Sequence, residues 1–284
     1  MTDPLISILN KHPEYSRLLQ ALQKGEGPAG VFGLGDAHKG HVAAALAAQS
    51  DMPLLLVAPN ELAAGKLCDD ISAFVPCVHF PAREIPMAGK GYTASTSIEA
   101  RRIAILSALS EGAKMAVTVS IQALMQRVAE PEVICSSVNS FSAGQVIDPK
   151  DMLTALVEAG YERVEVCENR GQVCRRGGYV DVFPMTGDNP VRIEFFDDEI
   201  DTLRTYDPVT QRSIDNIDSI LVPPATEMPI TAEARQRAVK ALKKRKASEL
   251  LDRLEEGGRP DNAVALLPLF YPGETTLLDY FKNG

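Results

Sequence analysis

Apolar residues in the first 120 positions alternate between strand-sized runs and segments with helical spacing, and this alternation limits the possible folds more than any other feature. Strands are expected at 29–34, 52–58, 78–80 and 115–119, with helices at 7–24, 61–74 and 97–111 and one that ends near 50. Because strands that alternate with helices form parallel sheets, we expect an α/β domain here.

The pattern changes after Pro131. A helix is expected at 151–159, followed by short strands at 164–166, 173–175, 179–183, 191–196 and near 214–222. Consecutive short strands joined by turn residues indicate an antiparallel sheet. A charged helix is expected at 231–256, where Gly257 and Gly258 end it.

These patterns divide the chain into three parts. We expect the α/β domain to begin at 1–135, an α+β domain to be inserted at 136–224, and residues 225–284 to supply a helix and return to the first domain, which is cut short.

Charge and composition limit the classes of partner that this chain is expected to bind. With 29 basic and 38 acidic residues the net charge is −9, which disfavours strong DNA binding. No apolar run reaches membrane-spanning length and the first residues lack a signal-peptide pattern, so we expect a cytoplasmic protein with no membrane partner. The five cysteines contain no C-x-x-C pair and the four histidines no metal-ligand spacing, which favours buried thiols over a metal site or a disulfide framework.

The turn at 33–40 stands where a P-loop, G-x-x-x-x-G-K-[ST], would lie. Gly33 and Lys39 fit that motif, but His38 replaces its second glycine and Gly40 replaces the residue whose hydroxyl holds Mg²⁺. Asp36 adds a negative charge inside an anion cradle. We therefore expect a degenerate P-loop that binds no nucleotide, and no other cofactor.

A second motif, Phe195 to Glu199, resembles a Walker-B strand that ends in carboxylates. It falls among the expected antiparallel strands rather than in a parallel sheet, so we interpret it as an acidic turn in solvent.

Every basic residue between Lys150 and Lys240 is an arginine: Arg163, Arg170, Arg175, Arg176, Arg192, Arg204, Arg212, Arg235 and Arg237. Guanidinium groups pair bidentately with carboxylates, which favours a protein interface with an acidic partner. The alternative is a set of ordinary surface arginines in weak ion pairs. The later basic run, Lys240 to Lys246, continues into acidic residues and is more typical of an exposed helix than of a DNA contact.

Three runs of residues carry a family resemblance: 175–184 (RRGGYVDVFP), 192–201 (RIEFFDDEID) and 207–210 (DPVT). They resemble the domain shared by the excision-repair protein UvrB and the transcription-repair coupling factors, and residues 54–60 resemble the strand that follows the P-loop in both. The likeness covers nearly the whole chain. The degenerate P-loop, the lack of a tyrosine-rich hairpin between Pro81 and Thr96, and the tail 266–271 favour the coupling factors.

This resemblance implies a degenerate RecA/helicase-like parallel-sheet domain with an inserted α+β domain that recruits UvrA. It implies no catalytic residue here, although the intact factor would contact RNA polymerase and translocate on DNA with ATP. A carboxy-terminal module would mask the UvrA-binding face until polymerase is engaged.

By position, the arginines of UvrB that face UvrA fall on Arg163, Cys174 and Arg176. Arg175 is the candidate replacement for the charge missing at Cys174, although strand alternation directs it to the opposite face. Tyr179 and Val180 are expected to anchor the partner through apolar contact. Two other readings remain open: a UvrB-like DNA-dependent ATPase or helicase fragment, and a non-specific DNA-binding domain that uses the helix at 240–246.

Overall fold

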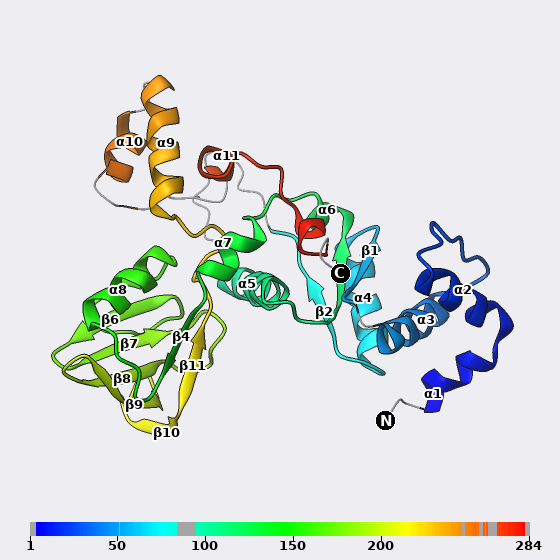
Figure 1. Ribbon diagram of the computed structural model, residues 1–284, viewed down its shortest axis with the longest axis horizontal. Coiled ribbons are helices and arrows are strands. Elements are labelled where there is room, and N and C mark those ends of the chain that lie inside the picture. The colour runs from blue at the N-terminus through cyan, green and yellow to red at the C-terminus, as the bar shows by residue number, and fades with distance from the viewer. Residues whose placement is uncertain are drawn as a thin grey trace. The chain divides into compact units, whose positions relative to one another are not determined.

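The computed structural model describes residues 4–50, 52–83, 95–245, 248–255, 258, 260 and 266–281. These residues divide into two compact units (Figure 1). Unit 1 draws on 1–83, 112–126 and 281–284, and unit 2 on 84–111 and 127–280. The sequence predicts no tyrosine-rich hairpin between Pro81 and Thr96, but residues 84–94 of this stretch lie outside the described residues.

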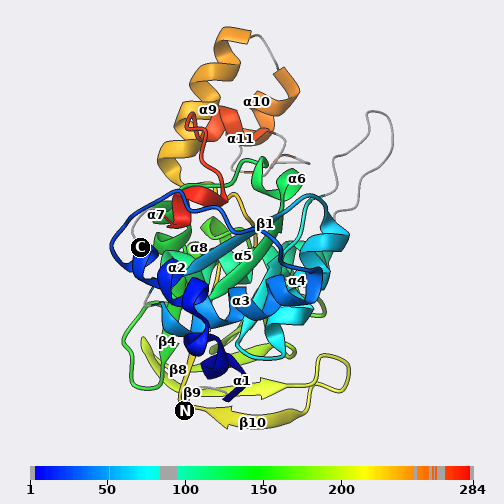
Figure 2. The ribbon, with the colours of Figure 1, turned by 90° about the vertical axis from the view of Figure 1, so that its right-hand side faces the viewer.

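Unit 1 contains a three-stranded parallel sheet in the order β1-β3-β2. Its elements are α1 (Pro4–Ser7), η1 (Ile8–Lys11), α2 (Pro13–Gln23), α3 (Asp36–Gln49), β1 (Leu54–Ala58), α4 (Glu61–Ser72), β2 (Cys77–Phe80), β3 (Ala116–Ser120) and α6 (Ile121–Leu124). Helix α4 connects β1 to β2, packs on all three strands and lies beside α3 (Figure 2). Asn60 caps α4 by accepting a 2.9 Å hydrogen bond from the backbone N–H of Ala63. The expected parallel α/β sheet is confirmed.

The strand expected at 29–34 does not form. Val31 and Phe32 are 49% and 91% exposed, so this apolar run is not held in a sheet. Gly33 has φ +82°, a conformation that interrupts an extended strand. The first strand–helix–strand unit therefore begins at β1, and residues 33–40, which span a short turn and the start of α3, do not follow a strand.

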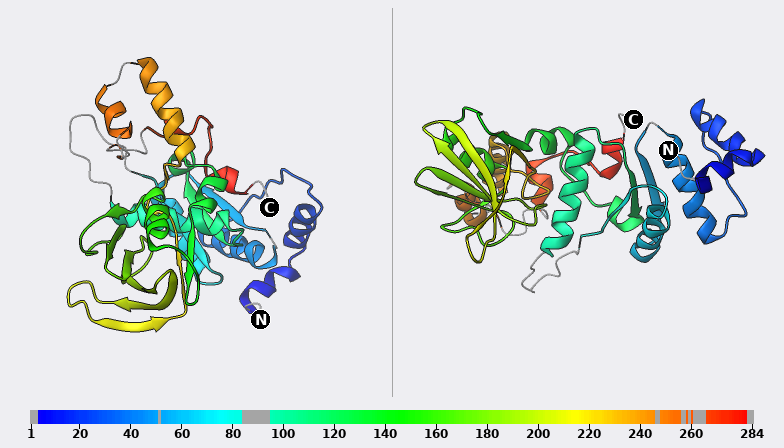
Figure 3. Two further views of the ribbon diagram at one scale, coloured as in Figure 1. Left: turned by 60° about the vertical axis from the view of Figure 1, so that its left-hand side comes forward. Right: turned by 90° about the horizontal axis from the view of Figure 1, so that it is seen from below.

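Unit 2 contains a six-stranded sheet in the order β10-β9-β8-β7-β6-β5 (Figure 3). Its strands are β5 (Glu162–Arg163), β6 (Gln172–Arg176), β7 (Tyr179–Phe183), β8 (Val191–Phe196), β9 (Glu199–Tyr206) and β10 (Ser213–Ile217). Neighbours pair antiparallel except β5 with β6. The expected mainly antiparallel sheet is confirmed, and the acidic motif at 195–199 is the hairpin between β8 and β9.

Two strand positions differ from expectation. The strand at 164–166 is replaced by β5, and the single strand near 214–222 is two strands, β10 and β11 (Ser219–Val222). Ile217 pairs with Leu203 in the large sheet, whereas Ser219 pairs with Ser142 of β4 (Asn139–Ser142) in a two-stranded sheet. Which strand a short segment joins depends on distant partners that local periodicity does not reveal.

The remaining elements of unit 2 are helical: α5 (Thr96–Ser110), α7 (Pro131–Ser136), α8 (Pro149–Glu158), α9 (Ala232–Arg245), α10 (Ser248–Glu255), α11 (Leu267–Phe270) and η3 (Leu277–Phe281). Helix α8 covers one side of the large sheet, where Met152, Leu153 and Leu156 pack with apolar residues of the strands. No helix among the described residues is long and apolar enough to cross a membrane.

The expected continuous helix at 231–256 is instead two helices, α9 and α10. An unbroken helix would separate Lys243 from Glu255 by about 18 Å, yet their side chains form an ion pair of 2.8 Å. Arg235 of α9 also donates to the backbone carbonyls of Leu254 and Gly258, at 3.1 and 2.9 Å. The chain turns back because Leu242 of α9 and Leu254 of α10 are buried in one apolar cluster.

A buried ion pair fastens α5 to the segment after β11. Arg102 donates from Nε and Nη2 to the two carboxylate oxygens of Glu227, at 2.6 and 2.9 Å. Both side chains are 0% exposed. Because the two opposite charges are buried together away from water, separating them would be costly, and this pair fixes the position of α5 within unit 2.

Candidate partner-binding surface

The six-stranded sheet has two chemically different sides. Side chains alternate along a strand, and paired residues on neighbouring strands share a side. We call the side that carries Cys174, Asp181, Arg192 and Arg204, which pair in turn across β6 to β9, the polar face. The opposite side, which carries residues such as Val173 and packs on α8, is the core face.

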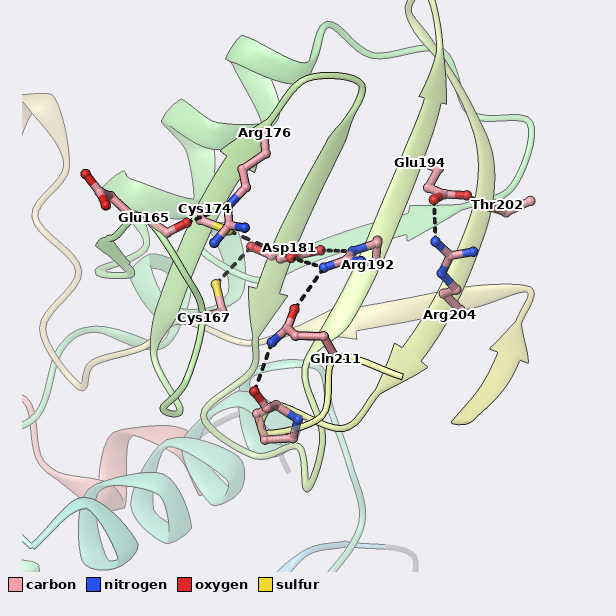
Figure 4. Close-up of polar contacts among 11 residues, drawn as sticks. Glu165, Cys167, Cys174, Arg176, Asp181, Arg192, Glu194, Thr202, Arg204 and Gln211 are labelled. Carbon is pink, nitrogen blue, oxygen red and sulfur yellow. Dashed lines mark hydrogen bonds and ion pairs between the residues drawn. The ribbon is translucent and has the colours of Figure 1, made fainter. Parts of the chain in front are cut away.

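An ion pair between β7 and β8 forms the centre of the polar face (Figure 4). Arg192 donates from Nε and Nη2 to the carboxylate oxygens of Asp181, both at 2.8 Å. Its guanidinium also lies 4.3 Å from the ring centroid of Tyr179 and 4.7 Å from that of Tyr206. These contacts raise the pKa of Arg192, chiefly through the hydrogen bonds to Asp181. Arg192 is therefore committed within the domain, and it holds Tyr179 in place.

A second pair lies further along the same face. Arg204 donates from Nη2 to Glu194, which also accepts a 3.0 Å hydrogen bond from the hydroxyl of Thr202 (Figure 4). The side chains of Arg204 and Glu194 are 30% and 34% exposed. Arg170 pairs with Asp188 at 2.9 Å outside this group. The alternative interpretation, arginines in ordinary ion pairs, thus holds for these residues.

The arginines expected to face UvrA lie at the edge formed by β5 and β6. Arg163 and Arg176 are exposed and Arg175 is half-buried. Within the described part of the chain, none of the three forms an ion pair; Arg176 donates from Nε to the backbone carbonyl of Glu165 at 2.8 Å. They differ in this respect from Arg192 and from the surface pairs.

Strand register separates these three arginines between the two faces. Arg176 pairs with Tyr179 and belongs to the polar face, whereas Arg175 pairs with Val180 and belongs to the core face. Arg163 pairs with Val173 in the parallel ladder, which places it by register on the side of Arg175. The footprint taken from the resemblance therefore does not lie on one flat face; it extends around the edge.

Val180 cannot serve as the expected apolar anchor. Its side chain is 0% exposed and packs in the main core of unit 2. Cys174 is also buried, at 1% exposed, with its Sγ 3.8 Å from the Asp181 carboxylate. Tyr179, half-buried beside Arg192, remains available to a partner. Local sequence reasoning could not assign these sides because the register across β6 and β7 was unknown.

The sequence did not single out Asp181 or Tyr206 as functional residues. A signal existed: Asp181 is an acidic residue in the middle of an otherwise apolar strand, and a carboxylate in that position requires a buried partner. The identity of that partner, Arg192, depends on the pairing of β7 with β8.

The degenerate P-loop leads into α3 in unit 1. Lys39 Nζ forms a 2.9 Å ion pair with the Asp36 carboxylate, and this hydrogen bond lowers the pKa of Asp36. Gly40 is buried, and a Cβ added there would lie 2.7 Å from the Cβ of Asp70 on α4. Helix packing therefore fills the place where a P-loop carries its hydroxyl. No group of metal-ligating side chains is found in the described ranges.

Polar side chains hydrogen-bond to one another at the carboxyl ends of the unit 1 strands, which is the usual ligand position in α/β sheets. Glu61 accepts hydrogen bonds from the Ser120 hydroxyl and, at 3.1 Å, from the backbone N–H of Ala82. His79 lies 3.4 Å from the same carboxylate. This carboxylate gives the strand ends an acidic character that is unsuited to a phosphate.

Comparison with known proteins places this geometry in context. Residues 140–228, from β4 to just beyond β11, match the family model described as the UvrB interaction domain. Transcription-repair-coupling factors are similar along most of the chain: 29% identity with that of Bacillus subtilis (strain 168), 31% with that of Staphylococcus aureus (strain bovine RF122 / ET3-1) and 31% with that of Myxococcus xanthus. These alignments cover 99%, 89% and 88% of this chain, but only 26%, 23% and 22% of the relatives. The chain thus spans about a quarter of their length.

Proposed function

We propose that this chain, which belongs to the transcription-repair-coupling factor family, uses its UvrB interaction domain to recruit the excision-repair protein UvrA to stalled transcription complexes. The observation that carries the proposal is the contrast among the arginines: Arg163, Arg175 and Arg176 gather at the β5–β6 edge without an internal ion pair in the described ranges, while Arg192 and Arg204 are paired.

The chemistry of this edge suits an acidic protein surface. A guanidinium presents several donors in one plane and pairs bidentately with carboxylates, and it is less costly to desolvate than an ammonium. Tyr179, held against Arg192 beside Arg176, adds a rigid aromatic contact of the kind that dominates interface energies. We propose that UvrA contacts Arg163 and Arg175 from one side of the edge and Arg176 and Tyr179 from the other.

We further propose that unit 1 supports this surface without hydrolysing nucleotide. Lys39 is paired with Asp36, and Gly40 packs against α4. The competing proposal, a UvrB-like DNA-dependent ATPase, requires that loop to hold Mg²⁺ and triphosphate. Calorimetry with Mg²⁺ and ATP distinguishes them: we expect no heat of binding at micromolar protein, and micromolar affinity would favour the ATPase.

Other parts of the expected function belong to a protein of the relatives' full length. These are contact with RNA polymerase, ATP-driven translocation on DNA, and masking of the UvrA-binding edge by a carboxy-terminal module. The domain limits at 135/136 and 224/225, the cytoplasmic location and the lack of strong DNA binding likewise remain proposals. If this chain lacks strong DNA binding, its affinity for duplex DNA should be weak and should not depend steeply on salt concentration.

Charge reversal tests the binding edge. We expect Arg163→Glu combined with Arg176→Glu to reduce UvrA affinity tenfold or more, a loss of about 1.4 kcal/mol or more, with an unchanged circular dichroism spectrum. Arg101→Glu is the matched control, because Arg101 is exposed on α5 outside the UvrB interaction domain. Normal affinity in the double variant, or an equal loss in the control, would remove the basis for this surface.

A further inference from the structure

Two buried cysteines meet beneath the polar face. Cys167 lies in the loop between β5 and β6, and Cys174 lies on β6; they are 0% and 1% exposed. Together with Val164 and Phe183 they form a small separate cluster. Both thiols point at Asp181: Cys167 Sγ is 3.4 Å from its backbone oxygen and Cys174 Sγ is 3.8 Å from its carboxylate (Figure 4).

The two residues also lie close to each other. Their sulfurs lie 3.4 Å and 3.8 Å from oxygens of the same residue, Asp181, within one small cluster, and each thiol shifts the pKa of the other. A disulfide needs its two sulfurs to approach from hydrogen-bonding distance to about 2 Å. Because both sulfurs lie against Asp181 in one cluster, we expect a small movement of the loop to bring them together.

We propose that Cys167 and Cys174 form a dithiol that peroxide oxidises to an intramolecular disulfide, and that this disulfide changes how Arg176 is presented. The five cysteines are free thiols in this structure, which is therefore the reduced state. The effect on UvrA rests on the function proposed above, whereas formation of the disulfide does not.

The reaction balances with hydrogen peroxide as oxidant. The Cys174 thiolate attacks one peroxide oxygen, so that an S–O bond forms, the O–O bond breaks and hydroxide leaves. The Cys167 sulfur then attacks the Cys174 sulfur; the S–O bond breaks, and the departing hydroxide takes the Cys167 proton and leaves as water. The proton that Cys174 lost on ionisation converts the hydroxide of the first step into the second water. Two thiols and one peroxide thus give one disulfide and two waters.

The surroundings assign different roles to the two sulfurs. The interaction with Cys167 lowers the pKa of Cys174, which makes Cys174 the more readily ionised thiol of the pair. The same interaction and burial raise the pKa of Cys167, which stays protonated. Glu165, Val166 and Glu168 beside Cys167 are exposed, and we expect oxidant to reach the pair when this loop opens.

The loop links this chemistry to the binding edge. Arg176 is held by the backbone carbonyl of Glu165, two residues before Cys167. A disulfide draws Cys167 toward β6 and withdraws both sulfurs from Asp181, which also supports Arg192. We expect oxidation to shift Glu165 and release or redirect Arg176.

Cys68 and Cys77 in unit 1 provide an internal comparison. Burial, and to a smaller extent the neighbouring Cys68, raise the pKa of Cys77 to about 12. Cys77 therefore stays protonated at neutral pH, and we expect this pair to stay reduced under mild oxidation.

Peptide mapping tests the disulfide. The reduced whole chain is treated with hydrogen peroxide, its free thiols are alkylated under denaturing conditions, and it is digested with trypsin. Cleavage after Arg163, Arg170 and Arg175 gives the peptides VEVCENR and GQVCR, which we expect to remain linked until a reductant is added. Free thiols should fall from five to three. Recovery of both peptides in alkylated form, or preferential linkage of Cys68 to Cys77, would overturn the proposal.

UvrA affinity then tests the coupling. The wild-type chain and Cys174→Ser are compared before and after peroxide, with Cys135→Ser, a change at an exposed cysteine on α7, as the matched control. We expect affinity to fall about tenfold on oxidation and to recover on reduction in wild type and Cys135→Ser, with no change in Cys174→Ser. If the oxidised chain contains the disulfide but binds UvrA as tightly as the reduced chain, the proposed effect on Arg176 is refuted. If the reduced chain itself fails to bind UvrA, the proposed function fails while the mapping result stands.

Discussion

Breaking the ion pair between Asp181 and Arg192 tests whether this pair supports the sheet rather than binding a partner. In Arg192→Met, the Asp181 carboxylate, whose side chain is 3% exposed, loses both 2.8 Å hydrogen bonds and keeps its charge. Removing one member of a buried pair costs about 3–5 kcal/mol. The two ring contacts of Arg192 add about 0.5–1 kcal/mol each.

A single Arg192→Met substitution should therefore lower the free energy of unfolding by at least about 3 kcal/mol, or the melting temperature by on the order of 10 °C. Combining it with Asp181→Leu removes the stranded charge, and we expect the double variant to recover to within about 1 kcal/mol of wild type. Urea unfolding followed by far-ultraviolet circular dichroism is the suitable assay, because the chain contains no tryptophan.

Two results would refute this reasoning. A loss of less than about 1 kcal/mol in Arg192→Met would mean that solvent already screens the pair. A double variant as unstable as the sum of its single changes would mean that the two residues act independently rather than as a pair.

Three other predictions follow from the described contacts. Gly40→Ser, which restores the P-loop hydroxyl, should not create nucleotide binding and should lower the free energy of unfolding by about 1–3 kcal/mol, because the added side chain overlaps α4. Calorimetry with ATP and thermal melting measure the two effects, and a stable variant that binds ATP would contradict both. Tyr179→Ala should weaken UvrA binding and leave most of the fold intact, whereas Val180→Asp should unfold unit 2; the reverse order, seen by pull-down and circular dichroism, would invert the face assignment. Glu227→Gln should lower the free energy of unfolding by about 3–5 kcal/mol because it removes the negative charge that faces the buried guanidinium of Arg102, and unchanged urea unfolding would show that α5 is held by other contacts.

Much of the fold could be predicted because its local signals agree with its tertiary contacts. The strands at β1, β7 and β8 carry dense apolar or alternating patterns, and each is paired on both sides or covered by a helix. The run at 29–34 had the apolar composition of a strand but not the conformation, since Gly33 takes a positive φ and nothing pairs with the run within the described residues. Composition alone does not reveal whether a neighbouring strand exists.

The candidate site was harder to predict because it depends on register and on distance. Adjacent positions differ in exposure: Tyr179 is half-buried and Val180 is fully buried, and only the pairing of β6 with β7 decides which one faces outward. The proximity of Cys167 to Cys174 depends on the path of an irregular loop, for which sequence gives no periodicity. The charge type of the surface was accessible from sequence, whereas its geometry was not.

Hydrogen–deuterium exchange of the whole chain, with and without UvrA, tests the central claim most directly. We predict that UvrA protects peptides from β5 to β7, residues 162–183, and leaves residues 33–49 and α9 unchanged. Protection confined to the degenerate P-loop or to the basic helix, with none at the β5–β6 edge, would contradict the account.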